Sequence, residues 1–233
     1  MRINLETIRN VNDLLYEKIL EISNLQIIND NDKIIKDIAL SIHAKTESII
    51  TLLTHGHSAG VDSIIRSIFE SSKNLEFILE KDTFIRSQTY LMSIEARKEK
   101  NMYNIWKING RVKADKPTFL HNNFFKKLIQ ISNPKLEQKN IYPDRWRSIV
   151  KRKNADVGIA NLKDLCEYLG EKSLKEYNFE YSHFSQEVHG TELKTSDKKT
   201  NDIYNQFRIV SLAGYLTDTT FNLIKYYKLK PKN

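Results

Sequence analysis

The chain of 233 residues carries 37 Lys and Arg against 29 Asp and Glu, which gives a net charge of +8 at neutral pH. It contains only 7 Gly and 4 Pro, about 5% of the residues, where roughly 12% is average. This count argues against an all-β fold, because its turns would need many more of these residues. The one cysteine, Cys166, excludes both an intramolecular disulfide framework and a Cys-rich zinc site.

Hydrophobic patterning gives no sign of a membrane protein. No segment approaches the roughly 18 uncharged apolar residues of a membrane span. Acidic residues also interrupt the first twenty positions, unlike a signal peptide. We therefore expect a cytoplasmic protein with no membrane contact. Its basic excess suits a polyanion such as RNA as a partner.

In the first half of the chain, apolar residues recur every three or four positions, the spacing of an amphipathic helix. Helices are predicted over residues 5–22, 32–53, 61–79 and 83–108. Asp32 is expected to cap the second of them. Gly56 and Gly60 interrupt the pattern and predict a joint before the third helix.

Beyond residue 110 the pattern is less regular. Short helices are predicted over residues 119–131 and after Pro143, with a loop over 151–158. Helical spacing returns over 162–169, where Gly170 is a plausible C-cap. The remaining expected elements are a helix from Ser173 to His189, a mobile loop over 190–201 and a final helix over 203–227.

No strand-like alternation persists, and no internal repeat occurs. The sequence therefore predicts an all-α fold, a helical bundle of long antiparallel helices in a single domain over residues 1–233. Within this domain we expect N-terminal helices (1–109), a loop-rich basic excursion (110–160) and C-terminal helices (161–233).

The first candidate site is the pair Arg66 and Glu70 in the apolar third helix. Residues four apart lie on one helix face, so the two side chains are neighbours. The pair can be a structural ion pair that fixes helix packing. Alternatively, Glu70 holds Arg66 so that the guanidinium meets a phosphate or another anion.

The second candidate site is the segment that contains Tyr181, Ser185 and His189. Steps of four place their phenol, hydroxyl and imidazole along one edge of the predicted helix. The dipole at the helix end favours protonation of His189. These groups can satisfy one another structurally, or they can serve a ligand.

A basic segment forms the third candidate. Five cations and an indole occur within nine residues, namely Arg145, Trp146, Arg147, Lys151, Arg152 and Lys153. The cations could hold a nucleic-acid backbone, and Trp146 could stack on a base. In the competing interpretation, Trp146 belongs to the core and the cations are an ordinary solvated surface.

Other chemistry finds little support. His55 and His57 are too few to hold a metal ion, so we expect no metal site. Cys166 lies in an apolar stripe and is expected to be a buried thiol. No glycine-rich phosphate-binding motif occurs, and no cofactor is expected.

The combination of Gly60, Arg66-x-x-x-Glu70, Trp146 and Tyr181-x-x-x-Ser185-x-x-x-His189-Gly190 resembles the bacterial domain-of-unknown-function 5677 family over roughly residues 35–225. That family is helical and distantly similar to the HEPN group, which includes RNA-cleaving toxins and phage-defence effectors. HEPN ribonucleases carry Arg-x(4–6)-His on one helix. This chain departs from that pattern, because no Arg precedes a His at that spacing.

A ribonuclease would therefore require Arg66 and His189 to meet across two helices. His189 would then exchange the proton of a ribose 2′-hydroxyl, and Arg66 would stabilise the phosphorane charge. Glu70 would orient Arg66, while Tyr181 and Ser185 would position the phosphate or a water molecule.

Our leading hypothesis is thus a metal-independent, ribonuclease-like toxin or anti-phage defence effector that acts on RNA or a nucleotide. The alternative is a non-enzymatic helical module that binds nucleic acid or protein. It could also be a homo-oligomer or a subunit of a larger complex.

Overall fold

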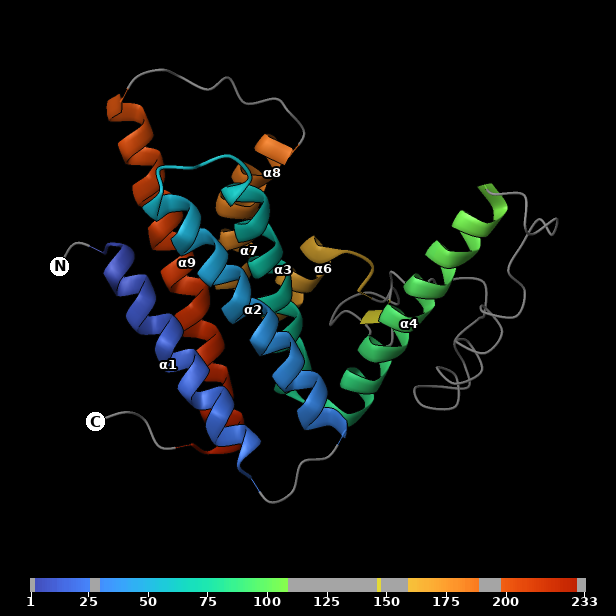
Figure 1. Ribbon diagram of the computed structural model, residues 1–233. Helices are drawn as coiled ribbons and strands as arrows, with labels where there is room; N and C mark the ends of the chain where they lie inside the picture. Colours follow the sequence, from blue (N-terminus) through green and yellow to red (C-terminus); the bar gives the residue numbers. More distant parts are fainter. Residues whose placement is uncertain (1–2, 26–29, 109–145, 148–158, 189–197, 230–233) are drawn as a thin grey trace. The chain divides into compact units, whose positions relative to one another are not determined.

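Figure 1 shows a computed structural model of the chain, which describes residues 3–25, 30–108, 146–147, 159–188 and 198–229. Within these ranges the chain forms helices joined by short turns and contains no strand, so the predicted all-α bundle is confirmed. The chain divides into two compact units, one built from Met1–Lys81 with Leu169–Asn233 and the other from Asp82–Tyr168. The second unit includes the predicted excursion over residues 110–160, most of which lies outside the described ranges, so the prediction of a single domain with this excursion stays a prediction.

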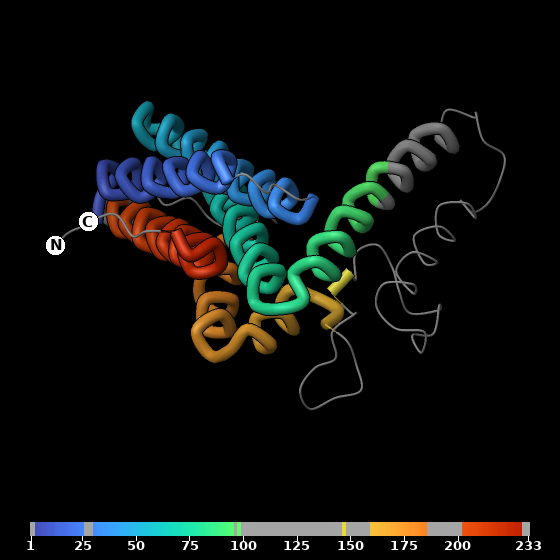
Figure 2. Tube along the Cα trace, turned by 90° about the horizontal axis from the view of Figure 1, so that it is seen from below, coloured from blue at the N-terminus to red at the C-terminus, as the bar shows by residue number. Residues whose placement is uncertain are grey.

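Four helices form a closed ring in the first unit. They are α1 (Leu5–Ser23), α2 (Asp30–Thr54), α3 (Val61–Glu80) and α9 (Lys198–Tyr227). α1 packs against α2 and α9, and α3 packs against the same two helices from the other side (Figures 1 and 2). The first and last long helices of the chain are therefore neighbours.

Helix directions follow from contacts at the helix ends. Near the start of α9, Gln206 Nε2 donates to the carbonyl of Ile3, just before α1, and Arg208 binds Asp62 at the start of α3. α9 therefore runs parallel to α1 and α3, whereas α2 runs antiparallel to its two neighbours (Figure 1).

The apolar stripes of these helices meet inside the ring. Side chains with at most 1% of their surface exposed include Ile8, Leu15, Ile19, Ile35, Ile42, Ile49, Ile65, Ile68, Phe69 and Leu216. Each such burial contributes about 1.5–3 kcal/mol, so the stripes dominate the stability of this unit.

The predicted joint between α2 and α3 is confirmed. Gly56 and Gly60 have φ angles of +73° and +80°, a backbone conformation that strains other residues, and Gly60 immediately precedes α3. Asp32 was wrongly expected to cap α2. The helix begins at Asp30, and Asp32 lies buried in its first turn, where it accepts a hydrogen bond of 2.6 Å from the Tyr227 hydroxyl.

A continuous helical segment covers one side of α3. It consists of α7 (Glu171–Glu176), the π-helical turn η3 (Tyr177–Tyr181) and α8 (Ser182–Val188). Its start was predicted at Ser173, but Gly170, with a φ of +120°, precedes the first residue of α7. Gly170 is thus the N-terminal cap of this segment. It also directly follows Leu169, the last residue of α6, where the sequence placed it as a C-cap.

The loop predicted over residues 190–201 is wrong for its last four residues, because α9 already begins at Lys198. Polar residues with adequate helix propensity extend this helix beyond its apolar stripe, which is the part that the sequence pattern detects. Residues 190–197 lie outside the described ranges.

In the second unit, α4 (Thr83–Ile108) and α6 (Leu162–Leu169) have the bounds that the sequence predicts. Arg86 of α4 is fully buried and donates 3.1 Å to the Tyr168 hydroxyl of α6, and Cys166 is buried as expected. The predicted helices at 119–131 and after Pro143, and the loop at 151–158, are outside the described residues. No described helix is both long and apolar enough to cross a membrane.

Candidate functional site

Helix α3 carries a stripe of charged residues along the side that meets α9 and the segment from α7 to α8. Asp62, Arg66, Glu70 and Lys73 follow one another at intervals of four, four and three residues, which places them on one helix face. Each of them finds partners on other elements. α3 therefore organises the polar contacts of the first unit.

Arg66 and Glu70 meet Tyr181, which projects from η3. The Arg66 Nε donates 2.9 Å to the Tyr181 hydroxyl oxygen and 3.3 Å to Glu70 Oε1. Tyr181 in turn donates its hydroxyl hydrogen to the same Glu70 oxygen at 2.8 Å. The three side chains that the sequence proposed for a shared site are thus brought together, in a closed triangle of hydrogen bonds.

The π-turn η3 positions Tyr181. The backbone N–H of Ser182 donates to the carbonyl of Tyr177, five residues earlier, which is the hydrogen bond of a π-helix. The rings of Tyr177 and Tyr181 stack at 5.1 Å, and Phe69 of α3 packs against Tyr181 at 5.4 Å. Aromatic packing on two sides therefore fixes the phenol beside Arg66.

The electrostatics of this triangle keep its protons in place. Partial burial, together with the hydrogen bond to Glu70 and the charge of Glu70, raises the pKa of Tyr181 to about 12, although Arg66 acts to lower it. Burial acts to lower the pKa of Arg66, but the charges and hydrogen bonds of Tyr181 and Glu70 outweigh it and raise that pKa. At neutral pH the phenol is therefore a neutral donor and the guanidinium a cation.

Within the described part of the chain, hydrogen bonds reach only one edge of the Arg66 guanidinium. Its Nε makes both hydrogen bonds, and neither Nη group has a hydrogen-bond partner among the described residues. The side chain is 27% exposed, so the free edge can be reached from solvent. A guanidinium anchored at Nε presents two parallel N–H donors, the geometry that binds carboxylate or phosphate oxygens.

Ser185 and His189 are not shown to join this triangle. The Ser185 hydroxyl donates 2.8 Å to the backbone carbonyl of Tyr181, one turn earlier in its own segment. It therefore serves the backbone where η3 meets α8, and its expected role next to a ligand stays a prediction. His189 lies outside the described residues, so its predicted role stays a prediction.

The basic segment is described only at Trp146 and Arg147. Trp146 is 2% exposed, and its ring meets Tyr90 of α4 edge-on at 5.1 Å. A buried indole cannot stack on a base, so this part of the nucleic-acid prediction is corrected, and the alternative with Trp146 in the core fits. The other cations of the segment, Arg145, Lys151, Arg152 and Lys153, lie outside the described residues.

Among the described residues no group of three or more His, Cys, Asp or Glu is arranged to hold a metal ion. His55 and His57 are both exposed, and the His55 Nδ1 lies 2.8 Å from the carbonyl oxygen of Thr51. His55 is thus engaged by the helix that precedes it.

Sequence reasoning missed a buried ion pair between α3 and α9. Arg208 contacts Asp62 through two hydrogen bonds, of 2.5 Å from Nε and 2.9 Å from Nη2, and Tyr204 donates 2.7 Å to the same carboxylate. Asp62 is 0% and Arg208 5% exposed. A pair separated by 146 residues leaves no local spacing signal. Because it is sealed from solvent, this pair supports the packing of α9 and offers no ligand site.

A second missed cluster surrounds Lys73, which is 2% exposed. Its Nζ lies 3.1 Å from Glu76 and 2.7 Å from Glu176 of α7, and it also donates 3.1 Å to the Ser173 hydroxyl. These contacts fasten α7 to α3. Burial of Ser173 in this cluster explains why it lies inside the helix that it was expected to open.

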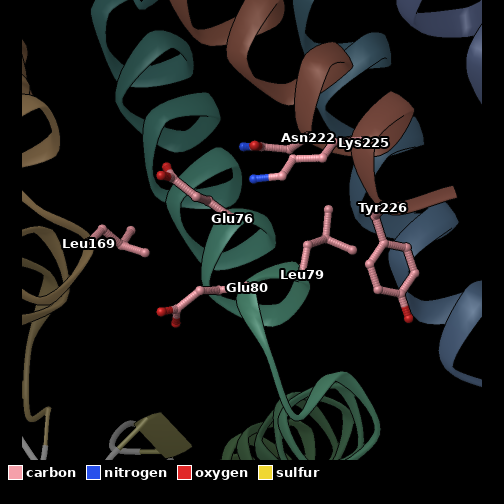
Figure 3. A pocket seen from close by; sticks show the side chains of 7 residues that line it. All are labelled: Glu76, Leu79, Glu80, Leu169, Asn222, Lys225 and Tyr226. Atoms are coloured by element: carbon pink, nitrogen blue, oxygen red, sulfur yellow. The ribbon is translucent and has the colours of Figure 1, made fainter. Parts of the chain in front are cut away.

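A cavity of about 420 Å³ lies near the end of α3, between α3 and the end of α9 (Figure 3). Its lining consists of Glu76, Leu79, Glu80, Leu169, Asn222, Lys225 and Tyr226. Two carboxylates and one ammonium give this cavity a net negative lining. It is therefore a poorer place for a phosphate than the free edge of Arg66.

Comparison with known proteins yields one match. A family model described as a family of unknown function, DUF5677, matches residues 32–202. The matched span contains α2, α3 and the segment from α7 to α8, and hence every residue of the Arg66 triangle. No curated protein and no solved structure matches the chain.

Proposed function

The chain belongs to DUF5677, a family to which no function has been assigned, and we propose from its site that it binds a phosphate group of RNA at Arg66. The sequence resemblance to this family is confirmed, over residues 32–202 in place of the expected 35–225. The observation that carries the proposal is the anchored guanidinium, fixed at Nε with its two Nη groups unused by the described residues.

A purely structural ion pair would be built differently. The buried Arg208 engages all three of its nitrogens, with Asp62 and Asn205, as buried polar groups normally do. Arg66 instead bonds through one nitrogen and keeps its remaining donors in reach of solvent. Pre-ordering by Tyr181 and Glu70 reduces the entropy that the side chain loses when it binds an anion.

RNA is the anion that the remaining features favour. The net charge of +8 promotes association with a polyanion. The distant resemblance of the family to HEPN proteins points to the same class of ligand. By this resemblance the chain is a candidate RNA-cleaving toxin or phage-defence effector. Both the resemblance and this role belong to the proposal.

Cleavage requires a further group. In the proposed reaction, His189 removes the proton of a ribose 2′-hydroxyl, whose oxygen attacks the adjacent phosphorus and displaces the 5′-oxygen of the next nucleotide. Arg66 stabilises the charge on the phosphorane oxygens, and the leaving 5′-oxygen takes a proton from a water molecule. The step needs no metal ion. Its products are a 2′,3′-cyclic phosphate and a 5′-hydroxyl.

The test compares the full chain with Arg66→Ala and with Arg9→Ala. Arg9 is an exposed arginine of α1 whose replacement removes the same charge elsewhere. We expect Arg66→Ala to bind a labelled single-stranded RNA at least tenfold more weakly, the loss of one charged hydrogen-bond pair, and Arg9→Ala to bind as the wild type does. Unchanged binding by a folded Arg66→Ala protein would refute the proposal.

Cleavage is tested separately, by the integrity of that RNA after incubation in the presence of a metal chelator. The ribonuclease hypothesis expects fragments with cyclic phosphate ends from the wild type and intact RNA from His189→Ala. RNA that is bound by the wild type and stays intact would favour the non-enzymatic binding module.

A further inference from the structure

Lys45 of α2 lies against α3 close to the Arg66 triangle. Its Nζ donates to the Ser67 hydroxyl at 2.8 Å and lies 3.5 Å from the Ser71 hydroxyl. The side chain is half-buried, and no carboxylate forms an ion pair with it in the part of the chain that the structure describes. Ammonium groups that leave water are usually paired with an acid, so this one is available to an anion from outside the chain.

The pKa of Lys45 is consistent with that interpretation. Burial lowers it from the ordinary lysine value, and the carboxylate of Glu70 acts in the opposite direction. The charge of Glu70 therefore reaches Lys45 as well as Arg66. An added anion would restore the stabilisation that Lys45 loses through desolvation.

Helix geometry places the two cations on opposite flanks of one exposed strip. Successive residues of a helix point about 100° apart, so Arg66 and Ser67 occupy different flanks of α3, with Glu70 between them. Ser63, one turn before Ser67, is exposed, and Glu70 is 42% exposed. Tyr181 borders this strip on the side of Arg66, and Lys45 borders it on the side of α2.

Charge balance shows what a second cation adds to the site. Arg66 and Glu70 neutralise each other, and a phosphate at the free edge of Arg66 would lie close to a carboxylate. Lys45 gives the strip a net charge of +1. The Ser67 hydroxyl accepts from Lys45 and can donate its own hydrogen to a phosphate bound by Lys45, whereas Ser71 donates its hydrogen to the Ser67 carbonyl.

We infer that Lys45, held by Ser67 and Ser71, is a second phosphate-binding residue, and that the strip takes two successive phosphodiester groups of an RNA strand. Arg66 binds one phosphate and Lys45 binds the next. The inference rests on the proposed function of Arg66. A diester backbone fits better than a pyrophosphate, because the two cations are held on different flanks of α3, one by Tyr181 and the other by Ser67, and a diester link separates two phosphorus atoms by more bonds than a pyrophosphate does.

The experiment measures binding of short RNAs by the full chain. ApA carries one phosphodiester and ApApA carries two. A second comparison, of AMP with ADP, tests whether the site binds a pyrophosphate. For the wild type we expect ApApA to bind about tenfold more tightly than ApA, because one more charged contact forms. Lys45→Met should lose this gain, so that it binds ApApA no more tightly than ApA, while Lys45→Arg should keep it.

Lys33→Met is the control, because Lys33 is an exposed lysine on the same helix. A folded Lys45→Met protein that keeps the full ApApA gain would overturn the inference. An equal gain from AMP to ADP, lost in the same variant, would also overturn it, since the ligand would then be a pyrophosphate. Failure of the proposed function gives another result: if Arg66 binds no phosphate, the Arg66→Ala protein binds ApA as tightly as the wild type does.

Discussion

The Nε of Arg66 on α3 donates a hydrogen bond of 2.9 Å to the hydroxyl of Tyr181 on η3, across 115 residues of sequence. This bond turns a local ion pair into a fixed guanidinium with a free edge, because Tyr181 also donates to Glu70. It joins two elements that the sequence marks separately.

Tyr181→Phe removes the hydroxyl and keeps the ring that packs on Phe69. Arg66 then keeps only its 3.3 Å contact with Glu70, so its guanidinium has more freedom to lose on binding. We expect RNA affinity to fall by about 0.5–1.5 kcal/mol, or roughly two- to tenfold, in a binding titration. Tyr177→Phe is the matched control, and an equal effect of both substitutions would contradict the anchoring role of the Tyr181 hydroxyl.

The raised pKa of Tyr181 predicts a dependence of stability on alkaline pH. A phenol with a pKa of about 12 in the folded protein and about 10 when unfolded contributes stability that is full below pH 10. This contribution is lost as the pH rises through 12. The difference in unfolding free energy between the wild type and Tyr181→Phe should therefore be constant up to about pH 10 and shrink above it. A difference that stays constant to pH 12 would contradict this pKa.

Asp62→Asn tests the sealed contact between α3 and α9. The substitution keeps the shape of the side chain but leaves the charge of Arg208 buried without a counter-charge, which typically costs about 3–5 kcal/mol. Asp37→Asn, at an exposed position on α2, should change stability by less than about 0.5 kcal/mol. Denaturant unfolding of both variants measures the difference, and equal stabilities would show that the pair does not hold α9.

Lys73 and Lys172 both contact Glu176, and a comparison of the two shows how much burial adds to the effect of an ion pair on stability. Lys73 is 2% exposed between Glu76 and Glu176, whereas Lys172 is 69% exposed although it lies 2.6 Å from Asp218. We expect Lys73→Met to cost about 3–5 kcal/mol and Lys172→Met less than about 1 kcal/mol. The measurement is urea unfolding, and a larger loss for Lys172→Met would refute this assignment.

Most helix positions could be predicted from local patterns. The bounds of α4 and α6 agree with the apolar periodicity, and Gly56 with Gly60 marks the joint before α3, because such signals lie within a few residues of each other. The start of α9 was missed, since its first turn is polar. No propensity signal indicates that Tyr177 to Tyr181 form a π-turn, which depends on packing against α3.

The candidate site was only partly predictable for a related reason. Arg66 and Glu70 could be paired because they are one turn apart, and Tyr181 was selected by its own segment. Periodicity cannot show which helices face each other, so Asp62 with Arg208 and Lys45 with Ser67 were not found. The sequence also could not decide whether Trp146 is buried, because an aromatic residue beside cations gives the same local pattern in a core and on a surface. The structure shows that Trp146 is buried.

The most direct test of the phosphate-binding claim is the salt dependence of RNA binding by the wild type and Arg66→Ala, with Arg9→Ala as the control. If Arg66 contacts a phosphate, its loss weakens binding and makes the slope of log K against log salt shallower by about 0.7. Arg9→Ala should keep the slope of the wild type. Equal affinities and equal slopes for the wild type and a folded Arg66→Ala protein would contradict the claim.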